Sequence, residues 1–298
     1  MNRKHLILSA SAALLFVGCQ SMQQFGEATL GKMDPALVDA VVPGGGALAK
    51  SFQDLTPEQE YYIGRATAAV VLGQYKAYDH KEANDYINTL GQSLAAFSDR
   101  PETFNGYRFH LLDSDDINAF AAPGGMVLVS RGMMKLCENE EDLAAVLAHE
   151  IGHIQFQHGV KAIKRSRLTS ALSIMTTAAA KEYGTEQLSA LTEAFEGSIN
   201  DVTSTLMNNG YGRALEYEAD GAAVTILDRA CYDPKALIRV LERMEATLKP
   251  GGLDFAKTHP NPIKRVDNAN KAIAATDGQA AAPSKAREAR FARFRAAL

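Results

Sequence analysis

The chain has 298 residues, of which 46% are hydrophobic, and a formal net charge of −4 at pH 7. This length allows one good-sized domain or two small ones. The mildly acidic charge, without any broad basic surface, argues against nucleic acid as a partner.

The N-terminus has the pattern of a secretory leader. Basic residues precede an apolar run, Leu6 to Val17, which is too short to span a bilayer but suits the hydrophobic region of a signal peptide. The run leads to Gly18-Cys19, which resembles a bacterial lipobox, although an aromatic residue stands where leucine is usual. We therefore predict a signal peptide over residues 1–18 and a lipidated N-terminus at Cys19. Gln20, the next residue, favours sorting to the outer membrane; the alternative is a plain secretory signal.

Residues 19–55 are predicted to be a tether, because they include a run of three glycines that begins at Gly44 and show no sustained periodicity. Such a linker would let a domain reach away from a membrane. Residues 56–275 carry periodic apolar patterns and form the predicted folded domain. Residues 276–298 form a basic tail.

Helices and strands are predicted before the first chemical motif. One helix begins at Thr56-Pro57, a typical cap and first position, and runs to about Tyr75; another spans Lys81 to Phe97. Three stretches are typical of strands, and we expect them to form a small sheet against the helix that follows: Tyr107–Leu112, Ile117–Ala121 and Met126–Ser130.

The segment that joins the last two strands ends in Pro123-Gly124-Gly125. An exposed edge strand can bind a substrate peptide as an additional strand, through main-chain hydrogen bonds. Ordinary hairpin chemistry also explains the turn. Both interpretations can hold together.

His149-Glu150-x-x-His153 lies in a predicted helix, Glu140 to Gln157, which Asn139 can cap. Histidines four positions apart share one helix face, so both imidazoles can bind one ion. Zinc at a catalytic site takes three protein ligands and keeps a further position for water. Glu150 could then take a proton from that water. The alternative is a pair of core histidines that happen to be four residues apart.

A third ligand is expected from Glu216-x-x-x-Asp220, near the start of a second helical stretch. We choose Glu216 as the ligand. Asp220 lies on the same face and is expected to accept the free ring N–H of a liganding histidine. Glu218 is expected to point elsewhere. The alternative is that these acids interact only with the helix dipole and solvent.

The remaining segments are less specific. Residues 161–209 are predicted to be mostly helical, with breaks near Gly184 and Gly197, and to act either as a lid or by ordinary packing. His158 follows His153 by five residues, so we expect it to face away from the metal and to bond to backbone or solvent. A helix is predicted over Pro234–Leu248.

Together these motifs resemble the HtpX-like and Oma-type zinc metallopeptidases, a family that also holds the CAAX prenyl proteases. The resemblance covers roughly Thr56 to Ala274. It depends on four motifs in the family's order, namely Asn118 to Gly125, His149-Glu150-x-x-His153, Glu216-x-x-x-Asp220 and Thr258-His259-Pro260.

The resemblance implies a mainly helical α+β fold, a gluzincin-type zincin with a small sheet beside the histidine helix. It implies one zinc ion per chain at His149, His153 and Glu216, with Glu150 as the base. In the family the His259 segment lies near the zinc, so His259 is expected either to be a fourth ligand that blocks the water or to donate to the oxyanion. HtpX-type members have transmembrane helices between these motifs. This sequence shows none, which favours the periplasmic lipoprotein branch.

The expected function is therefore that of a zinc metalloendopeptidase anchored to the periplasmic side of the outer membrane. It would hydrolyse peptide bonds of misfolded or stalled envelope proteins. The alternative is a chaperone-like assembly factor whose zinc site is closed or structural. Pairing of Arg265 with Asp220 is left open by the sequence.

Two features lie at the edges of this scheme. Cys137 and Cys231 flank the two ligand-bearing helices, so a disulfide between them is a hypothesis; the alternative is two small buried thiols. The tail from Ser284 to the C-terminus could form a short basic amphipathic helix. It would then touch anionic lipid or a partner, dock on its own domain, or stay disordered.

Overall fold

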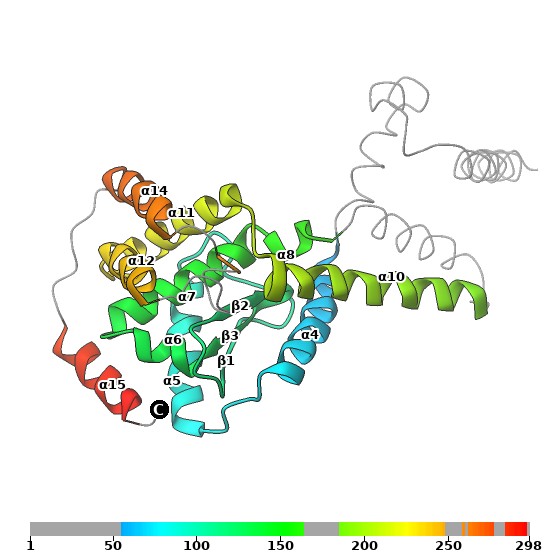
Figure 1. Ribbon diagram of the computed structural model, residues 1–298, viewed down its shortest axis with the longest axis horizontal. Helices are drawn as coiled ribbons and strands as arrows, with labels where there is room; N and C mark the ends of the chain where they lie inside the picture. The colour runs from blue at the N-terminus through cyan, green and yellow to red at the C-terminus, as the bar shows by residue number, and fades with distance from the viewer. Residues whose placement is uncertain (1–54, 164–184, 248–257, 260–261, 277–283, 297–298) are drawn as a thin grey trace, which may run out of the picture. The chain divides into compact units, whose positions relative to one another are not determined.

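The computed structural model describes residues 55–163, 185–247, 258–259, 262–276 and 284–296, which Figure 1 traces from blue to red. The predicted signal peptide, Cys19 and the tether up to residue 54 lie outside the described residues. Within those described ranges, no helix combines the length and the apolar character needed to cross a bilayer.

Helix α4 (Pro57–Gln74) begins where the sequence predicts, because Thr56 caps it. The Thr56 hydroxyl accepts from the Gln59 backbone N–H at 3.2 Å, and the Gln59 side chain accepts from the Thr56 N–H at 2.9 Å. This reciprocal pair satisfies two donors that a helix start otherwise leaves open. Helix α5 (Lys81–Ala95) ends two residues before the predicted Phe97, a difference that helix fraying commonly produces.

The three predicted strands are confirmed as β1 (Arg108–Leu112), β2 (Ala119–Ala122) and β3 (Met126–Ser130). Their order is β1-β3-β2, with β1 parallel and β2 antiparallel to β3. The expected edge strand is therefore β2. The chain turns from β2 into β3 through Gly124, whose φ of 73° is easily reached only by glycine.

Helix α6 (Arg131–Leu136) leads into α7 (Glu140–Gln155), which carries the histidine pair and is almost wholly buried. The predicted cap is confirmed, since the Asn139 side chain accepts a backbone hydrogen bond at 2.9 Å. Helix α7 ends two residues earlier than predicted. Gln157 adopts a left-handed conformation with φ of 55°, which breaks the helix, and a short helix α8 (His158–Lys161) follows.

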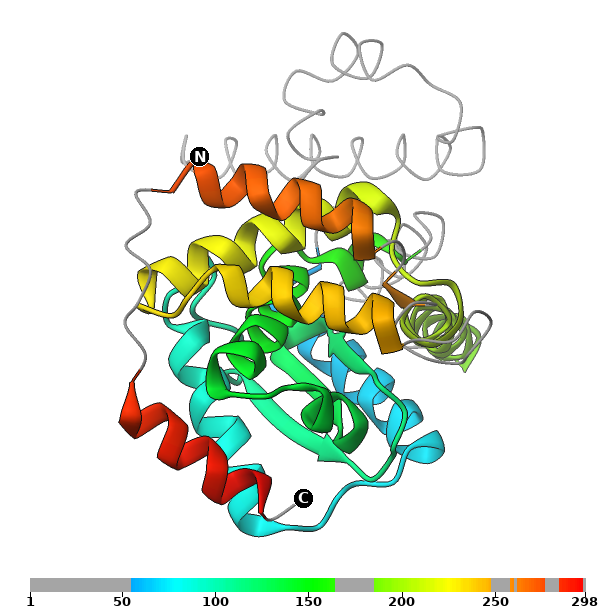
Figure 2. The same ribbon diagram turned by 60° about the vertical axis from the view of Figure 1, so that its left-hand side comes forward.

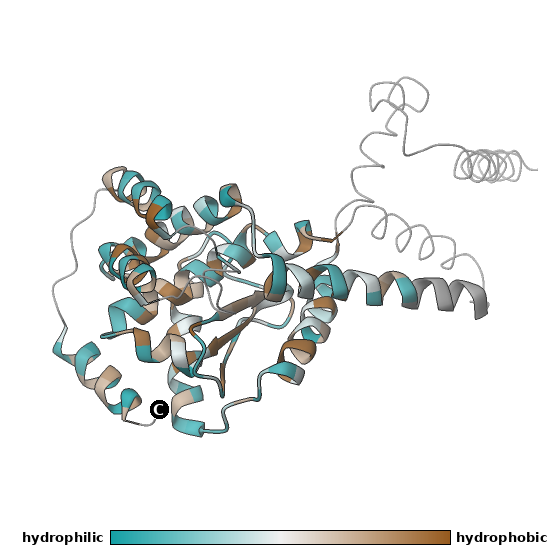
Figure 3. Cartoon of the chain, viewed as in Figure 1, coloured by the Kyte–Doolittle hydropathy of each residue, from teal (hydrophilic) through white to brown (hydrophobic). Residues whose placement is uncertain are grey.

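The sheet is buried on both faces, with alternate residues facing opposite sides. Phe109 and its register partner Val127 face the core that α5 and α7 share. Phe120 and its partner Leu128 face a second core with Ile63 of α4. Figure 3 shows the strands among the most hydrophobic segments. The sheet thus forms a central layer between α4 on one side and the histidine helix on the other.

Helix α10 (Thr185–Ser204) runs through Gly197 without the predicted break and continues as a π-helical turn, Thr205–Asn209. A glycine inside a helix costs only about 1 kcal/mol relative to alanine, which packing can outweigh. The predicted break near Gly184 lies outside the described residues, as does part of the stretch 161–209 that was expected to act as a lid or by ordinary packing. Within the described part, α10 packs against α4 (Figure 1).

Three further helices pack together beside α7, namely α11 (Arg213–Arg229), α12 (Lys235–Thr247) and α14 (Pro262–Ala274). Figure 2 shows them side by side. Helices α7 and α11 approach closely at Gly152, where an added Cβ atom would lie 2.8 Å from the Ala219 carbonyl oxygen. The absence of a side chain at this position sets the spacing between the two helices.

The C-terminal tail forms helix α15 (Lys285–Arg295), which docks on its own domain, one of the three predicted alternatives. Its two phenylalanines are buried. The ring of Phe294 stacks on Tyr86 with centroids 4.5 Å apart. Arg290 pairs with the buried carboxylate of Glu140 at 2.6 Å. This helix therefore holds the N-terminal end of α7 in place.

The hypothesised disulfide between Cys137 and Cys231 is not formed, and this part of the sequence interpretation is wrong. Both residues are free thiols in opposite environments. The Cys137 thiol is buried and donates to the Met133 carbonyl oxygen at 3.4 Å. Cys231 is exposed just beyond the end of α11, with φ of 56°. A bridge would require the buried thiol to leave the core.

Candidate metal centre

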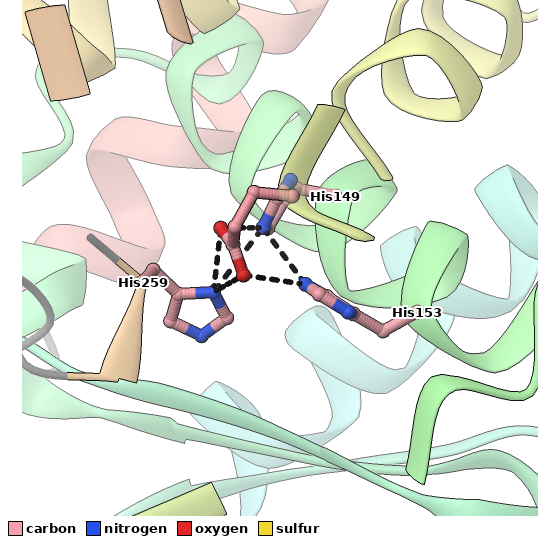
Figure 4. Close-up of side chains that lie close together, drawn as sticks. His149, His153 and His259 are labelled. Atoms are coloured by element: carbon pink, nitrogen blue, oxygen red, sulfur yellow. Dashed lines mark hydrogen bonds and ion pairs between the residues drawn. The ribbon is translucent and has the colours of Figure 1, made fainter. Parts of the chain in front are cut away.

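Helix α7 brings His149 and His153 to one face, one turn apart, as the sequence predicts. Their Nε2 atoms lie 3.1 Å from each other, and both rings are buried. Figure 4 shows the two imidazoles converging with that of His259. Because these two ring nitrogens point at one small volume, both can bind the same cation.

Glu216 completes the arrangement from the first turn of α11. Its carboxylate oxygens lie 3.5 Å from the Nε2 atom of His149 and 3.6 Å from that of His153. The carboxylate is fully buried. Burial raises the pKa of Glu216, but His259 and Arg265 outweigh it and hold the pKa well below its ordinary value. A negative charge is thus maintained next to the two ring nitrogens.

His259 joins this group through its Nδ1 atom. That nitrogen lies 3.4 Å from the Nε2 atom of His149 and 3.1 Å from both carboxylate oxygens of Glu216. The preceding residue fixes the segment: the Thr258 carbonyl accepts from the Tyr211 N–H at 3.1 Å, and its hydroxyl donates to the Asn118 side chain at 3.3 Å. Anchoring at both contacts aims the His259 ring at the ligand pair.

These four residues fit a metal ion such as zinc. One ligand atom from each lies within 4.8 Å of all the others, and all four side chains are buried. Four atoms bound at about 2.0–2.1 Å at the corners of a tetrahedron are roughly 3.3 Å apart. Five of the six pairs are 3.1 to 3.6 Å apart, which brackets that value, and the sixth pair, His153 with His259, lies within 4.8 Å. Two imidazoles and a carboxylate are also a donor set that zinc prefers.

Glu150 lies beside the cluster without belonging to it. Its side chain is fully buried, and neither carboxylate oxygen has a hydrogen-bond partner among the described residues. The Nε2 atom of His259 lies 3.8 Å from one of these oxygens. Burial raises the pKa of Glu150. A buried carboxylate left open in this way is suited to accepting a proton from a molecule that enters the site.

Asp220 lies where the sequence reasoning expects it. One carboxylate oxygen is 3.0 Å from the Nδ1 atom of His149, on the far side of the ring from the cluster. The pairing of Arg265 that the sequence left open is present: its guanidinium donates to both Asp220 oxygens, at 2.6 and 2.9 Å. Arg265 also lies 3.1 Å from Glu216. One buried cation therefore fixes two carboxylates of α11.

His158 stays outside the cluster, as predicted, but its expected backbone or solvent partner is wrong. Its Nδ1 atom lies 2.8 Å from the Nδ1 atom of His153, on the side of that ring away from the cluster. The five-residue offset points away only along an unbroken helix, and the left-handed Gln157 breaks it. Glu218, expected to point elsewhere, does stay outside the cluster, but it lies 3.0 Å from the Nε2 atom of His158.

Tyr211 is a further residue that sequence reasoning missed. Its ring stacks on His153, with centroids 4.3 Å apart and planes at 19°. Its buried hydroxyl has no hydrogen-bond partner among the described residues, and burial raises its pKa. A single tyrosine just before a helix has no distinctive sequence pattern. Its role becomes visible only in the structure, where it lies beside the histidines.

Comparisons with known proteins agree with this geometry. The model of "Peptidase family M48" matches residues 81–273, which include every residue of the cluster. The chain belongs to this peptidase family. The resemblance to HtpX-like and Oma-type peptidases is thereby confirmed, and with it a mostly helical, zincin-like fold with a small sheet.

Individual relatives carry related names. The chain is 29% identical over 252 residues to the "Beta-barrel assembly-enhancing protease" of Escherichia coli strain K12, covering 81% of this chain and 49% of the relative. It is 34% identical over 166 residues to the "Mitochondrial metalloendopeptidase OMA1" of Schizosaccharomyces pombe, covering 54% of this chain and 44% of the relative. The chain therefore spans about half the length of these relatives.

Proposed function

We propose that this chain is a zinc-dependent metalloendopeptidase. The observation that carries the proposal is the combination of a buried set of donors at tetrahedral spacing with an open carboxylate beside it. His149, His153 and Glu216 would hold the ion, and Glu150 would be the base. Family membership supports the same reading, because the relatives are named as proteases and metalloendopeptidases.

The residues have distinct tasks in peptide hydrolysis. A zinc ion supplies Lewis acidity, which polarises a peptide carbonyl and acidifies a water molecule. Glu150 takes the proton of the attacking water and passes it to the leaving nitrogen. Its raised pKa suits this exchange, since a base whose pKa is closer to neutral both accepts and releases a proton readily. Asp220 and Arg265 keep the ligands oriented.

The proposed substrates are unfolded segments of misfolded or stalled envelope proteins. Support comes from the position of β2, an edge strand that packs against the histidine helix. Its residues are at most 3% exposed, so a peptide could form main-chain hydrogen bonds with β2 only after the covering segments move. Such binding reads backbone and so suits unfolded chains. The leader-like N-terminus with Cys19 supports a lipoprotein on the periplasmic side of the outer membrane.

Cleavage of unfolded casein by the purified protein tests the enzymatic proposal. Glu150→Gln should abolish cleavage, because the amide cannot accept the proton, while leaving metal binding intact. Glu242→Gln, on the exposed face of α12, is the matched control and should cleave as the natural protein does. Equal cleavage of casein by Glu150→Gln and the natural protein would contradict the proposal.

A chaperone-like assembly factor is the second candidate, and one observation favours it. His259 places its Nδ1 atom at the fourth corner of the cluster, the position that a catalytic zinc keeps for water. A site held this way would bind metal without hydrolysing peptides. In cells, Glu150→Gln separates the two: a protein that folds but loses its cellular function cannot be acting as a chaperone alone.

A further inference from the structure

His158 and Glu218 form a hydrogen-bonded chain that runs from the candidate metal centre to the protein surface. The His158 ring is fully buried and lies between His153 and Glu218. At the outer end, the Glu218 side chain is 48% exposed. The rings of Phe156 and Tyr211 pack against the His158 ring, with centroids 5.7 Å away in each case. These contacts hold the middle of the chain in one orientation.

The direction of each hydrogen bond in this chain follows from its outer end. An ionised carboxylate can only accept, so the Nε2 atom of His158, 3.0 Å from Glu218, must carry the hydrogen. A buried imidazole favours its neutral form, which leaves a lone pair on the Nδ1 atom of His158. The Nδ1 atom of His153, 2.8 Å away, must then be the donor.

This assignment decides which nitrogen of His153 faces the metal with a lone pair. With the hydrogen on Nδ1, the Nε2 atom of His153 is unprotonated, and that atom is the one 3.1 Å from His149 and 3.6 Å from Glu216. His149, by contrast, lies directly against a carboxylate, since Asp220 is 3.0 Å from its Nδ1 atom. The two ligands therefore differ: one touches its carboxylate, and the other is separated from it by an imidazole.

We propose that His158 and Glu218 are positioning residues that fix the tautomer and orientation of His153 for metal binding. This inference rests on the proposed metal site and names residues that act on it from outside. Partners that orient a liganding histidine typically change metal affinity by about 10–100-fold when removed. The Glu218 carboxylate, which is partly exposed to solvent, would act on His153 through two successive hydrogen bonds.

Two pairs of variants in the purified protein separate this role from simple packing. His158→Leu removes the acceptor, whereas His158→Asn keeps an acceptor oxygen at the place of Nδ1. Glu218→Leu and Glu218→Gln make the same change in charge, but only the glutamine keeps an acceptor for His158. Urea unfolding of the metal-free proteins identifies any variant that fails to fold, and the Glu218 pair then decides alone.

The first measurement is zinc affinity, by competition with a chelator, together with the absorption spectrum of the cobalt-substituted protein. His158→Leu should weaken zinc binding by about 10–100-fold and shift the cobalt bands, and His158→Asn should restore most of both. Glu218→Leu should weaken binding more than Glu218→Gln. The proposal would be overturned if His158→Leu had the same zinc affinity and cobalt spectrum as the natural protein. It would also be overturned if the two variants at each position did not differ from each other in affinity and spectrum.

The second measurement is the tautomer of His153, from nitrogen-15 shifts of labelled histidine in metal-free protein. We expect hydrogen on Nδ1 in the natural protein and in Glu218→Gln, and a mixture in His158→Leu and Glu218→Leu. An unchanged tautomer in all variants would overturn the proposal. Because no metal is needed, this result stands even if the natural protein binds no zinc, which would instead contradict the proposed function.

Discussion

Arg265 and Asp220 form a bidentate ion pair in which both side chains are fully buried, with distances of 2.6 and 2.9 Å. The pair joins α14 to α11, and Asp220 in turn contacts His149. When one residue of a buried ion pair is replaced by an uncharged one, the charge of the other stays buried without compensation. The pair therefore couples the stability of the domain to the orientation of His149, one of the proposed metal ligands.

Replacing Arg265 by leucine should destabilise the protein strongly. Loss of one partner from a buried pair typically costs about 3–5 kcal/mol of unfolding free energy, because the other charge stays buried. Urea denaturation of metal-free protein measures this cost. Lys264→Leu, on the exposed side of the same helix, is the control and should change stability by less than about 0.5 kcal/mol. Equal stability of the two variants would contradict the assignment.

The same pair should give a defined pH dependence. Burial raises the pKa of Asp220, but Arg265 and His149 outweigh it and hold the pKa below its ordinary value. A depressed carboxyl pKa contributes stability above the unfolded-state value, near ~3.9, and that contribution is lost as the pH falls through the folded-state value. Leucine removes the cation that lowers the pKa of Asp220 and leaves burial, which raises it, so Asp220 of the variant takes up a proton at a higher pH than in the natural protein. The stability gap between the natural protein and Arg265→Leu should therefore shrink as the pH falls. A gap that grew as the pH fell from about 8 to 4 would contradict the assignment.

The direction in which His259→Ala changes peptidase activity should decide between the two roles expected for His259. Its Nδ1 atom lies at the fourth corner of the cluster, so we expect alanine to weaken zinc binding and to raise cleavage of unfolded casein at saturating zinc. Removing a donor to the oxyanion would instead lower kcat by about 10²–10³-fold. A fall of that size, with zinc affinity unchanged, would assign His259 to catalysis.

The two described cysteines should differ in reactivity. Burial raises the pKa of the Cys137 thiol, which keeps it protonated and unreactive in the folded protein, whereas Cys231 is exposed. Iodoacetamide should therefore modify Cys231 in native protein and both residues in unreduced urea-unfolded protein. Mass spectrometry of the peptides reads each site separately. If neither cysteine were modified after unfolding, the result would support a disulfide between Cys137 and Cys231.

Helix α15 should be held mainly by its buried phenylalanines. Phe291→Ala removes a side chain that is 3% exposed, and such truncations cost about 3–5 kcal/mol. Because α15 is a terminal helix, we expect the loss as faster amide hydrogen exchange along α15. Arg293→Ala changes an exposed residue of the same helix and should leave exchange unaltered. Unchanged exchange in Phe291→Ala would mean that the ion pair of Arg290 with Glu140 holds the helix.

Much of the fold could be predicted because its signals are local. The capping residues Thr56 and Asn139, the alternation in the strands and the spacing of the two histidines each act within a few positions of the chain. The residues that sequence reasoning missed depend on tertiary packing instead. His158 reaches His153 only because Gln157 turns the chain, and no pattern marks that turn. The positions of Tyr211 and His259 beside the two histidines of α7 depend on how separate segments fold together.

The close approach of α7 and α11 at Gly152 has a consequence for metal choice. The two helices carry the donor atoms, and their separation is set where one of them has no side chain. A methyl group there would meet the backbone of Ala219 and force the helices apart by some tenths of an ångström, moving Glu216 away from the imidazoles. The radius of the cation that the proposed site can hold is thus governed by a residue that offers no donor atom.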